Sequence, residues 1–107
     1  MIAKYESVML FAESTTQEEI DAFIEKVRQT AKGNDGSVEA VEPWGKRDLA
    51  YELGKHRAAH YVLLRMTGTG MTVKEVERLY RLDERVIRHL TVAAEEAPKV
   101  KTEAAHV

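Results

Sequence analysis

Two stretches with the spacing of a helical capping box constrain the fold of this chain most, because each marks where a helix starts. At residues 16–19 and again at residues 72–75, a threonine precedes a glutamate by three positions, so the two side chains can satisfy free backbone N–H groups at a helix start. Apolar residues recur at helical intervals after each stretch. We therefore expect one helix that ends at Gly33 in a left-handed cap, and a second helix that is capped by Thr72.

Apolar runs of strand length predict four strands around these helices. The second strand carries Pro43 and Gly45, and because proline cannot donate to a hydrogen-bonded ladder, we expect this strand at a sheet edge. The order of strand, helix, strand, strand, helix, strand indicates an α+β fold with two helices on one face of a four-stranded antiparallel sheet. The other face has no helix over it, so we expect a partner to cover its apolar residues. The strands are expected at residues 5–11, 37–53, 60–66 and 86–93.

Length and composition predict one cytoplasmic domain. The 107 residues suffice for a single modest core. We expect the domain at residues 1–94 and a disordered tail at residues 95–107, which has no apolar period. The chain has no cysteine, no secretory leader pattern and no apolar run near the ~20 residues of a membrane span. These features favour a reducing compartment and no membrane association.

Charge is unevenly distributed along the chain. The formal net charge is −2, so bulk electrostatics give no reason to expect nucleic acid. Residues 44–65 nevertheless carry five Lys and Arg side chains against two acids. A polyanion must therefore bind a local patch, and this central segment is the basic one.

The stretch WGKRDLAY, residues 44–51, combines an indole, a glycine, two adjacent cations and a tyrosine in one expected strand. On an RNA surface, such cations neutralise phosphates while flat rings meet unstacked bases. Alternatively, Trp44 and Tyr51 are half-buried strand aromatics, and Lys46 and Arg47 keep a sheet edge soluble. Local composition alone favours the second interpretation.

Three stretches of the sequence resemble one known family. WGKRDLAY, followed by Lys55 and by AHYVL at residues 59–63, resembles the central hairpin of the bacterial small-subunit ribosomal protein S-six family. LDERVIRHLTV at residues 82–92 resembles the last strand of that family, and the opening KYE at residues 4–6 matches as well. The motifs are specific in combination, and the resemblance covers about residues 2–94.

The resemblance implies a ferredoxin-like βαββαβ fold, no catalytic activity and no cofactor. It also implies binding to small-subunit rRNA together with ribosomal protein S-eighteen, and a role in subunit assembly on the ribosome. The chain departs from the family pattern at Glu52 and Gly54, which leaves the local turn geometry open. The residues expected to contact RNA are Lys4, Lys46, Arg47, Lys55, His56, Arg57, Arg88 and His89. The residues expected to contact the protein partner are Trp44, Leu49, Tyr51 and Tyr61.

The residue pattern gives little support to catalysis or metal binding. His56 and His60 would lie ~13 Å apart in one extended strand, too far to share an ion. Ser7 lacks the strained elbow of a nucleophilic serine, and no cysteine is present to pair with a histidine. Gly68 and Gly70 bracket a helix start without the spacing of a P-loop or a dinucleotide motif. We therefore expect no enzyme activity, no metal and no small-molecule substrate.

Two other functions stay open at this stage. A single-strand RNA binder of the RRM class shares this element order, but residues 60–66 lack the pattern that puts stacking aromatics on the third strand. A ligand-sensing dimer on the same fold is disfavoured by the missing catalytic constellation, although a fold alone excludes no function. The favoured interpretation is a structural ribosomal protein that binds rRNA through phosphate contacts and RNA shape.

Overall fold

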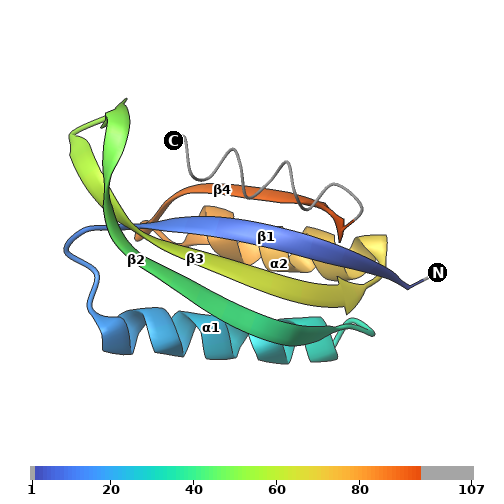
Figure 1. The fold of residues 1–107 in the computed structure, drawn as a ribbon. Helices are drawn as coiled ribbons and strands as arrows, with labels where there is room; N and C mark the ends of the chain where they lie inside the picture. The colour runs from blue at the N-terminus through green and yellow to red at the C-terminus, as the bar shows by residue number, and fades with distance from the viewer. Residues whose placement is uncertain (1, 95–107) are drawn as a thin grey trace.

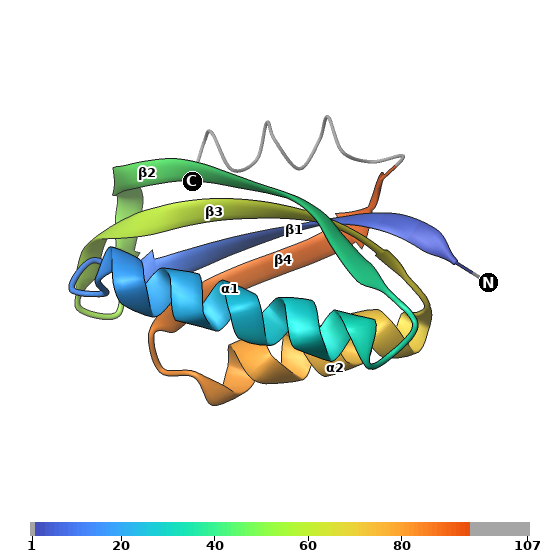
Figure 2. The same ribbon diagram turned by 90° about the horizontal axis from the view of Figure 1, so that it is seen from below.

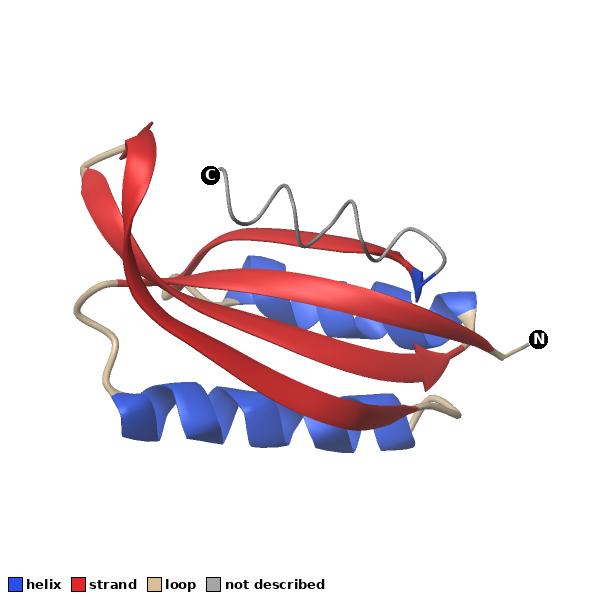
Figure 3. Ribbon diagram, viewed as in Figure 1, coloured by secondary structure: helices blue, strands red, loops and turns tan. Residues whose placement is uncertain are grey.

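The computed structural model describes residues 2–94 of the chain. Its elements follow the expected order of strand, helix, strand, strand, helix, strand (Figures 1 and 3). The expected tail at residues 95–107 lies outside the described residues. The elements are β1 (Ala3–Ala12), α1 (Gln17–Lys32), β2 (Ser37–Leu53), β3 (His56–Gly68), α2 (Gly70–Leu82) and β4 (Val86–Ala93).

The strands form one antiparallel sheet in the order β2-β3-β1-β4. Both helices pack on the same face of this sheet (Figure 2), so the ferredoxin-like α+β arrangement is confirmed. β2 lies at an edge, as Pro43 predicted, and its ladder with β3 is interrupted between Pro43 and Gly45. Gly45 has a φ of 83°, a left-handed conformation that is strained for residues with a Cβ. The edge strand therefore bends where the sequence predicted it.

α1 begins as the sequence predicts but ends differently. The Thr16 hydroxyl accepts a hydrogen bond from the Glu19 backbone N–H, and the Glu19 carboxylate accepts one from the Thr16 N–H. At the other end, Gly33 has a right-handed φ of −70°, so the expected left-handed cap at Gly33 is wrong. Asp35 takes the left-handed conformation instead, with a φ of 62°. The Asn34 side chain donates to a carbonyl of the last turn, which satisfies an acceptor that the helix leaves free.

α2 begins about one turn earlier than expected. Its N-cap is Thr69, whose hydroxyl accepts from the Thr72 backbone N–H while the Thr72 hydroxyl accepts from the Thr69 N–H. The prediction of a cap at Thr72 is wrong, because Thr72 takes the place that Glu or Gln usually has at the third helical position. A Cβ added at Gly68 would lie 2.5 Å from the Thr72 hydroxyl oxygen. Close packing therefore requires glycine at this position.

The main core lies between the sheet and the two helices. A chain of hydroxyl groups crosses it: the Ser7 Oγ lies 2.8 Å from the Tyr80 Oη, and the Thr91 Oγ1 donates to the Ser7 Oγ over 3.0 Å. Burial raises the pKa of Tyr80 above its usual value, so the phenol stays protonated and bonded. The buried residues of this core are Met9, Phe11, Ile20, Phe23, Ile24, Val27, Ala31, Val62, Leu64, Met66, Val76 and Tyr80.

The second face of the sheet carries a smaller apolar cluster of its own. Figure 1 shows the outer part of the β2–β3 hairpin bending away from the sheet on the side opposite the helices. Val8, Leu10, Tyr61 and Leu63 are each at most 4% exposed. The expectation that a partner must cover these residues is therefore wrong, because side chains of the hairpin and of β4 pack against them. Those side chains are Trp44, Leu49, Leu53, Ile87 and Val92.

Candidate nucleic-acid interface

The hairpin holds a cation against two aromatic rings. Trp44 on β2 and Tyr61 on β3 stack with ring centroids 6.4 Å apart and an interplanar angle of 17°. The Arg47 guanidinium carbon lies 5.6 Å from the Trp44 ring centroid and 5.9 Å from that of Tyr61. Within residues 2–94, Arg47 forms no ion pair with a carboxylate. Its guanidinium is therefore held by the rings, with a contact worth about 0.5–1 kcal/mol at exposed sites.

Tyr51, near the hairpin tip, contacts the strand at the opposite edge of the sheet. The Arg88 Nη1 donates a hydrogen bond to the Tyr51 hydroxyl over 3.0 Å. Since β2 and β4 are the two edges, this bond links the hairpin to the far strand across the second face. Tyr51 is 58% exposed, so most of its ring is free for another molecule.

Two other hairpin cations are exposed and loosely paired. The Lys46 Nζ lies 3.5 Å from a carboxylate oxygen of Glu13, and the Arg57 Nε lies 3.9 Å from one of Glu52. The Lys46 and Arg57 side chains are 57% and 80% exposed. Exposed pairs of this kind contribute about 0–1 kcal/mol. A phosphate can therefore replace either carboxylate at little cost.

Three further predicted RNA contacts lie at different places. Lys55 is exposed at the turn between β2 and β3, and His56 beside it is half-buried. Lys4 is exposed as well. It pairs with Thr67 in the ladder between β1 and β3, at the end of β3 far from the turn. The structure thus brings Lys55 and His56 close to the hairpin tip and leaves Lys4 apart.

His89 faces the helices and not the hairpin. It lies opposite Met9 in the ladder of β1 and β4, and Met9 belongs to the main core. The His89 ring lies 5.2 Å from the Tyr80 ring, and its Nδ1 lies 3.8 Å from the Glu77 carboxylate. Burial lowers the pKa of His89, and the Glu77 charge opposes this shift. The structure therefore does not bring His89 together with the hairpin cations.

The four predicted contacts to a protein partner differ in exposure. Tyr51 is exposed, Trp44 and Leu49 are half-buried, and Tyr61 is 1% exposed. Burial raises the pKa of Tyr61, as expected for a phenol removed from water. Tyr61 therefore supports Trp44 and Arg47 from within the fold, while Tyr51 offers the largest free apolar surface of the four.

Leu90 was not predicted and belongs to the same face. It is 41% exposed and lies opposite Val8 in the ladder of β1 and β4. Alternation along β4 puts Arg88 and Leu90 on one face of the sheet. Because this alternation is visible in the sequence, the position of Leu90 on this face could have been predicted from it.

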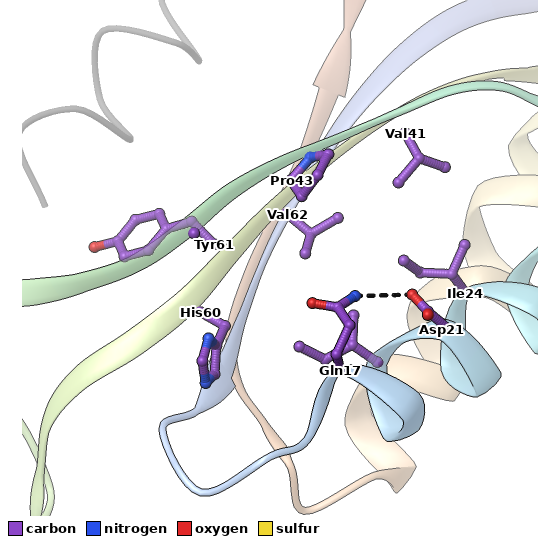
Figure 4. Close-up of a pocket in the computed structure, with 10 residues that line it drawn as sticks. Gln17, Asp21, Ile24, Val41, Pro43, His60, Tyr61 and Val62 are labelled. Carbon is purple, nitrogen blue, oxygen red and sulfur yellow. Dashed lines mark hydrogen bonds between the residues drawn. The ribbon is translucent and has the colours of Figure 1, made fainter.

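The hollow in Figure 4 lies between the start of α1 and the base of the hairpin. His60 and Val62 line one side, and on the other the Gln17 side-chain amide donates to the Asp21 carboxylate over 2.8 Å. Its volume is about 80 Å³, far below the ~300–1,000 Å³ of typical small-molecule sites. In the described part of the chain, no group of three or more His, Asp or Glu side chains could hold a metal ion.

The helices of residues 2–94 include none that is long and apolar enough to cross a membrane.

Ribosomal proteins of several bacteria are similar to this chain over most of its length. A family model described as Ribosomal protein S6 matches residues 4–93. Relatives named Small ribosomal subunit protein bS6 are 38% identical over 94 residues in Sinorhizobium fredii and 39% identical over 100 residues in Rhizobium meliloti. These matches cover 88% and 91% of this chain, and the chain spans 63% and 67% of the length of the two relatives.

The fold agrees with that sequence similarity. The crystal structure of 30S ribosomal protein S6 from Thermotoga maritima superposes with a TM-score of 0.81 at 26% sequence identity. The superposition covers 98% of this chain and 99% of the other. With the matched family model and the relatives above 30% identity, it shows that the chain belongs to the ribosomal protein S6 family.

Proposed function

We propose that the chain is a structural protein of the small ribosomal subunit in the cytoplasm, where it binds small-subunit rRNA and assists assembly. Family membership supports the ribosomal part of this proposal. The observation that carries the RNA-binding part is that Lys46, Arg47 and Arg57 are exposed cations of the hairpin, with Lys46 on the helix side of β2 and Arg47 on the second face, in a chain whose net charge is −2. Since the whole chain repels a polyanion, these local cations must supply the attraction.

The hairpin cations are suited to phosphate contacts. Lys46 and Arg57 exchange a weak exposed ion pair for a phosphate, and the exchange releases counterions from the RNA. Arg47 is already held over Trp44, so it loses little conformational freedom on binding. The contacts fix the position of the RNA and carry no base sequence by themselves. Specificity then comes from RNA shape and from the surface shared with a protein.

The proposed protein partner is ribosomal protein S-eighteen, as the family resemblance implies. Tyr51 and Leu90 offer exposed apolar surface on the second face of the sheet, and Trp44 and Leu49 are half-buried beside it. Aromatic residues in such a position are frequent anchors of protein interfaces. If each protein completes a surface for the other and for the RNA, binding is coupled, and neither binds rRNA well alone.

The protein performs no bond chemistry in this account. It lowers the free energy of one rRNA conformation by holding RNA helices in a fixed geometry. Membership in the ribosomal protein S6 family supports this binding role.

The proposal is tested by binding titrations of the full chain with three RNA samples under one salt condition. These are small-subunit rRNA with S-eighteen, the same rRNA alone, and a short single-stranded RNA of unrelated sequence. We expect tight binding only in the first sample. Comparable binding to the short RNA would favour the RRM-like alternative, and no binding in any sample would refute a ribosomal role.

A further inference from the structure

The outer part of the β2–β3 hairpin, residues 46–58, carries the three cations that we propose for RNA binding. This outer hairpin bends away from the sheet (Figure 1), and its ladder is interrupted where it leaves the sheet, between Pro43 and Gly45. Interruptions of this kind bend a strand and disrupt the pairing that holds it in place. The angle of the outer hairpin therefore depends on contacts other than the ladder.

Tyr51 lies in a second interruption of the same ladder. Between Asp48 and Leu53, β2 advances five residues while the paired residues of β3 advance by two. The surplus residues of β2, with Tyr51 among them, bulge out of the ladder. Strand pairing thus does not fix the position of Tyr51, and a side-chain contact has to do so.

Arg88 supplies that contact from the opposite edge of the sheet. Its Nη1 donates a hydrogen bond to the Tyr51 hydroxyl over 3.0 Å. Arg88 lies beside Leu10 in the ladder of β1 and β4, and Leu10 lies beside Tyr61 in the ladder of β1 and β3. At about 4.8 Å per strand, the Arg88 backbone is ~10 Å from that of Tyr61. The long Arg88 side chain therefore reaches across the second face to the hairpin.

The Arg88 guanidinium is not held by a carboxylate. Within residues 2–94, the ion pairs of the structure do not include Arg88. Burial raises the pKa of Tyr61, and the charges of Arg47 and Arg88 both oppose this rise. Arg88 therefore lies close to the base of the outer hairpin, and its donor groups are available to Tyr51.

The other contacts of the outer hairpin set its angle less sharply. Leu49 packs against the apolar cluster of the second face, but apolar contacts are not directional. Lys46 pairs with Glu13 over 3.5 Å, with both side chains about half exposed, and exposed pairs contribute little. The bond between Tyr51 and Arg88 is directional, and it joins the two edges of the sheet.

We propose that Arg88 is a positioning residue, which holds the outer hairpin over the second face through Tyr51 and so keeps the RNA-binding cations in one arrangement. This role rests on the proposed function and deepens it, because Arg88 then acts on the hairpin and does not contact a phosphate. One hydrogen bond of this kind changes a two-state equilibrium about 2- to 10-fold. Binding that requires the held arrangement weakens as the fraction of chains in that arrangement falls.

The distance between two spin labels measures the arrangement of the outer hairpin directly. The chain has no cysteine, so Lys55→Cys at the hairpin turn and Glu18→Cys on α1, both at exposed positions, give two unique attachment sites. In the free full chain we expect one narrow distribution of distances. Tyr51→Phe and Arg88→Gln should each broaden it, and the double variant should broaden it no further. An unchanged distribution in either single variant would overturn the proposal.

Arg28→Gln is the matched control, because it removes one exposed arginine of α1, on the helix side of the sheet. It should leave the distribution of distances unchanged. Equal broadening by Arg28→Gln would show that loss of charge, and not loss of the bond to Tyr51, moves the hairpin, and would overturn the proposal. These measurements use no RNA. They therefore test the role of Arg88 even if the chain fails to bind rRNA, a failure that would refute the proposed function alone.

Binding to rRNA in the presence of S-eighteen separates positioning from a direct phosphate contact. If Arg88 acts through Tyr51, Arg88→Gln and Tyr51→Phe should each weaken binding about two- to threefold, and the double variant no more than either alone. The dependence of log affinity on log salt concentration should keep its wild-type slope in all three. If Arg88 contacts a phosphate itself, Arg88→Gln should flatten that slope by about one unit while Tyr51→Phe has no effect. This second pattern would overturn the proposal.

Discussion

Replacing Tyr51 by alanine separates two roles that an aromatic residue of the hairpin can have, docking a partner or stabilising the fold. Tyr51 is 58% exposed and its hydroxyl accepts one hydrogen bond, from Arg88. Tyr61, in the same face of the sheet, is 1% exposed and stacks on Trp44. Tyr61→Ala is therefore the matched control for a role in the fold.

The structure sets the size of each effect. A tyrosine that buries its whole side chain removes about 200 Å² from water; with 58% of Tyr51 exposed, about 80 Å² is buried. At about 25 cal/mol per Å², Tyr51→Ala lowers the free energy of unfolding by at most ~2 kcal/mol. The fully buried Tyr61 should cost ~3–5 kcal/mol on the same substitution.

Two assays on purified variants test these values. Urea denaturation measures the free energy of unfolding, and a titration with S-eighteen in the presence of rRNA measures association. We expect Tyr51→Ala to weaken association by ~1–3 kcal/mol, or about 5- to 150-fold. Tyr51→Phe keeps the ring and should weaken it far less. A folding loss of ~3 kcal/mol or more in Tyr51→Ala, or unchanged association, would refute the assignment of Tyr51 to the partner surface.

Two further predictions concern the core beside β4. Because burial lowers the pKa of His89 below its ordinary value of 6.5, neutral His89 contributes stability that is complete above that value and is lost as the pH falls through the lowered pKa. The urea midpoint of the wild type should thus fall more steeply below about pH 6.5 than that of His89→Gln. The same dependence of the midpoint on pH in both proteins would contradict this prediction. Ser7→Ala leaves the hydroxyls of Tyr80 and Thr91 without a partner and should cost ~2–3 kcal/mol, against ~1 kcal/mol for Tyr80→Phe, which leaves the bond between Ser7 and Thr91 intact. The reverse order in denaturant unfolding would show that the hydroxyl chain is misassigned.

The element order was predictable because apolar periodicity and the cap at Thr16 are local signals. The start of α2 was not predictable, since Thr72 replaces the glutamate that normally identifies a capping box. The hydrogen bonds between Thr69 and Thr72 show where the helix begins. β3 begins at His56 and not near His60, because the polar residues that resemble a turn continue the long hairpin ladder. Pairing across strands, which sequence patterns do not specify, decides these boundaries.

The candidate site rests on the family resemblance more than on local composition. Lys46, Arg47 and Arg57 were proposed because they match the basic hairpin of the family, whereas local composition alone favoured an ordinary soluble edge strand. His89 was a candidate as well, and it lies in the stretch that resembles the last strand of the family. The strand register separates His89 from Arg88. Neighbouring residues of a strand point to opposite faces, and His89, which pairs with Met9, faces the helices.

The ion pair between the buried Glu6 and Arg65 was missed entirely. The two residues are far apart in sequence, and each looks like an ordinary surface charge on its strand. Only the ladder between β1 and β3 brings them together and buries the carboxylate. Burial of a polar side chain depends on what packs around it, which no local pattern contains.

The most direct test of the central claim is the salt dependence of rRNA binding by two variants of equal charge. The first replaces Lys46, Arg47 and Arg57 by alanine. The second replaces Lys26, Arg28 and Lys32, three exposed cations of α1, and so removes the same charge away from the hairpin. Both are measured with S-eighteen present, after circular dichroism has shown that each is folded.

The account predicts that only the hairpin variant loses phosphate contacts. Its plot of log affinity against log salt concentration should flatten by ~2–3 units relative to wild type, because each lost contact removes about one released counterion. The α1 variant should keep the wild-type slope. Equal flattening in both variants would mean that net charge and not the hairpin governs binding, and an unchanged slope in the hairpin variant would contradict the proposed interface.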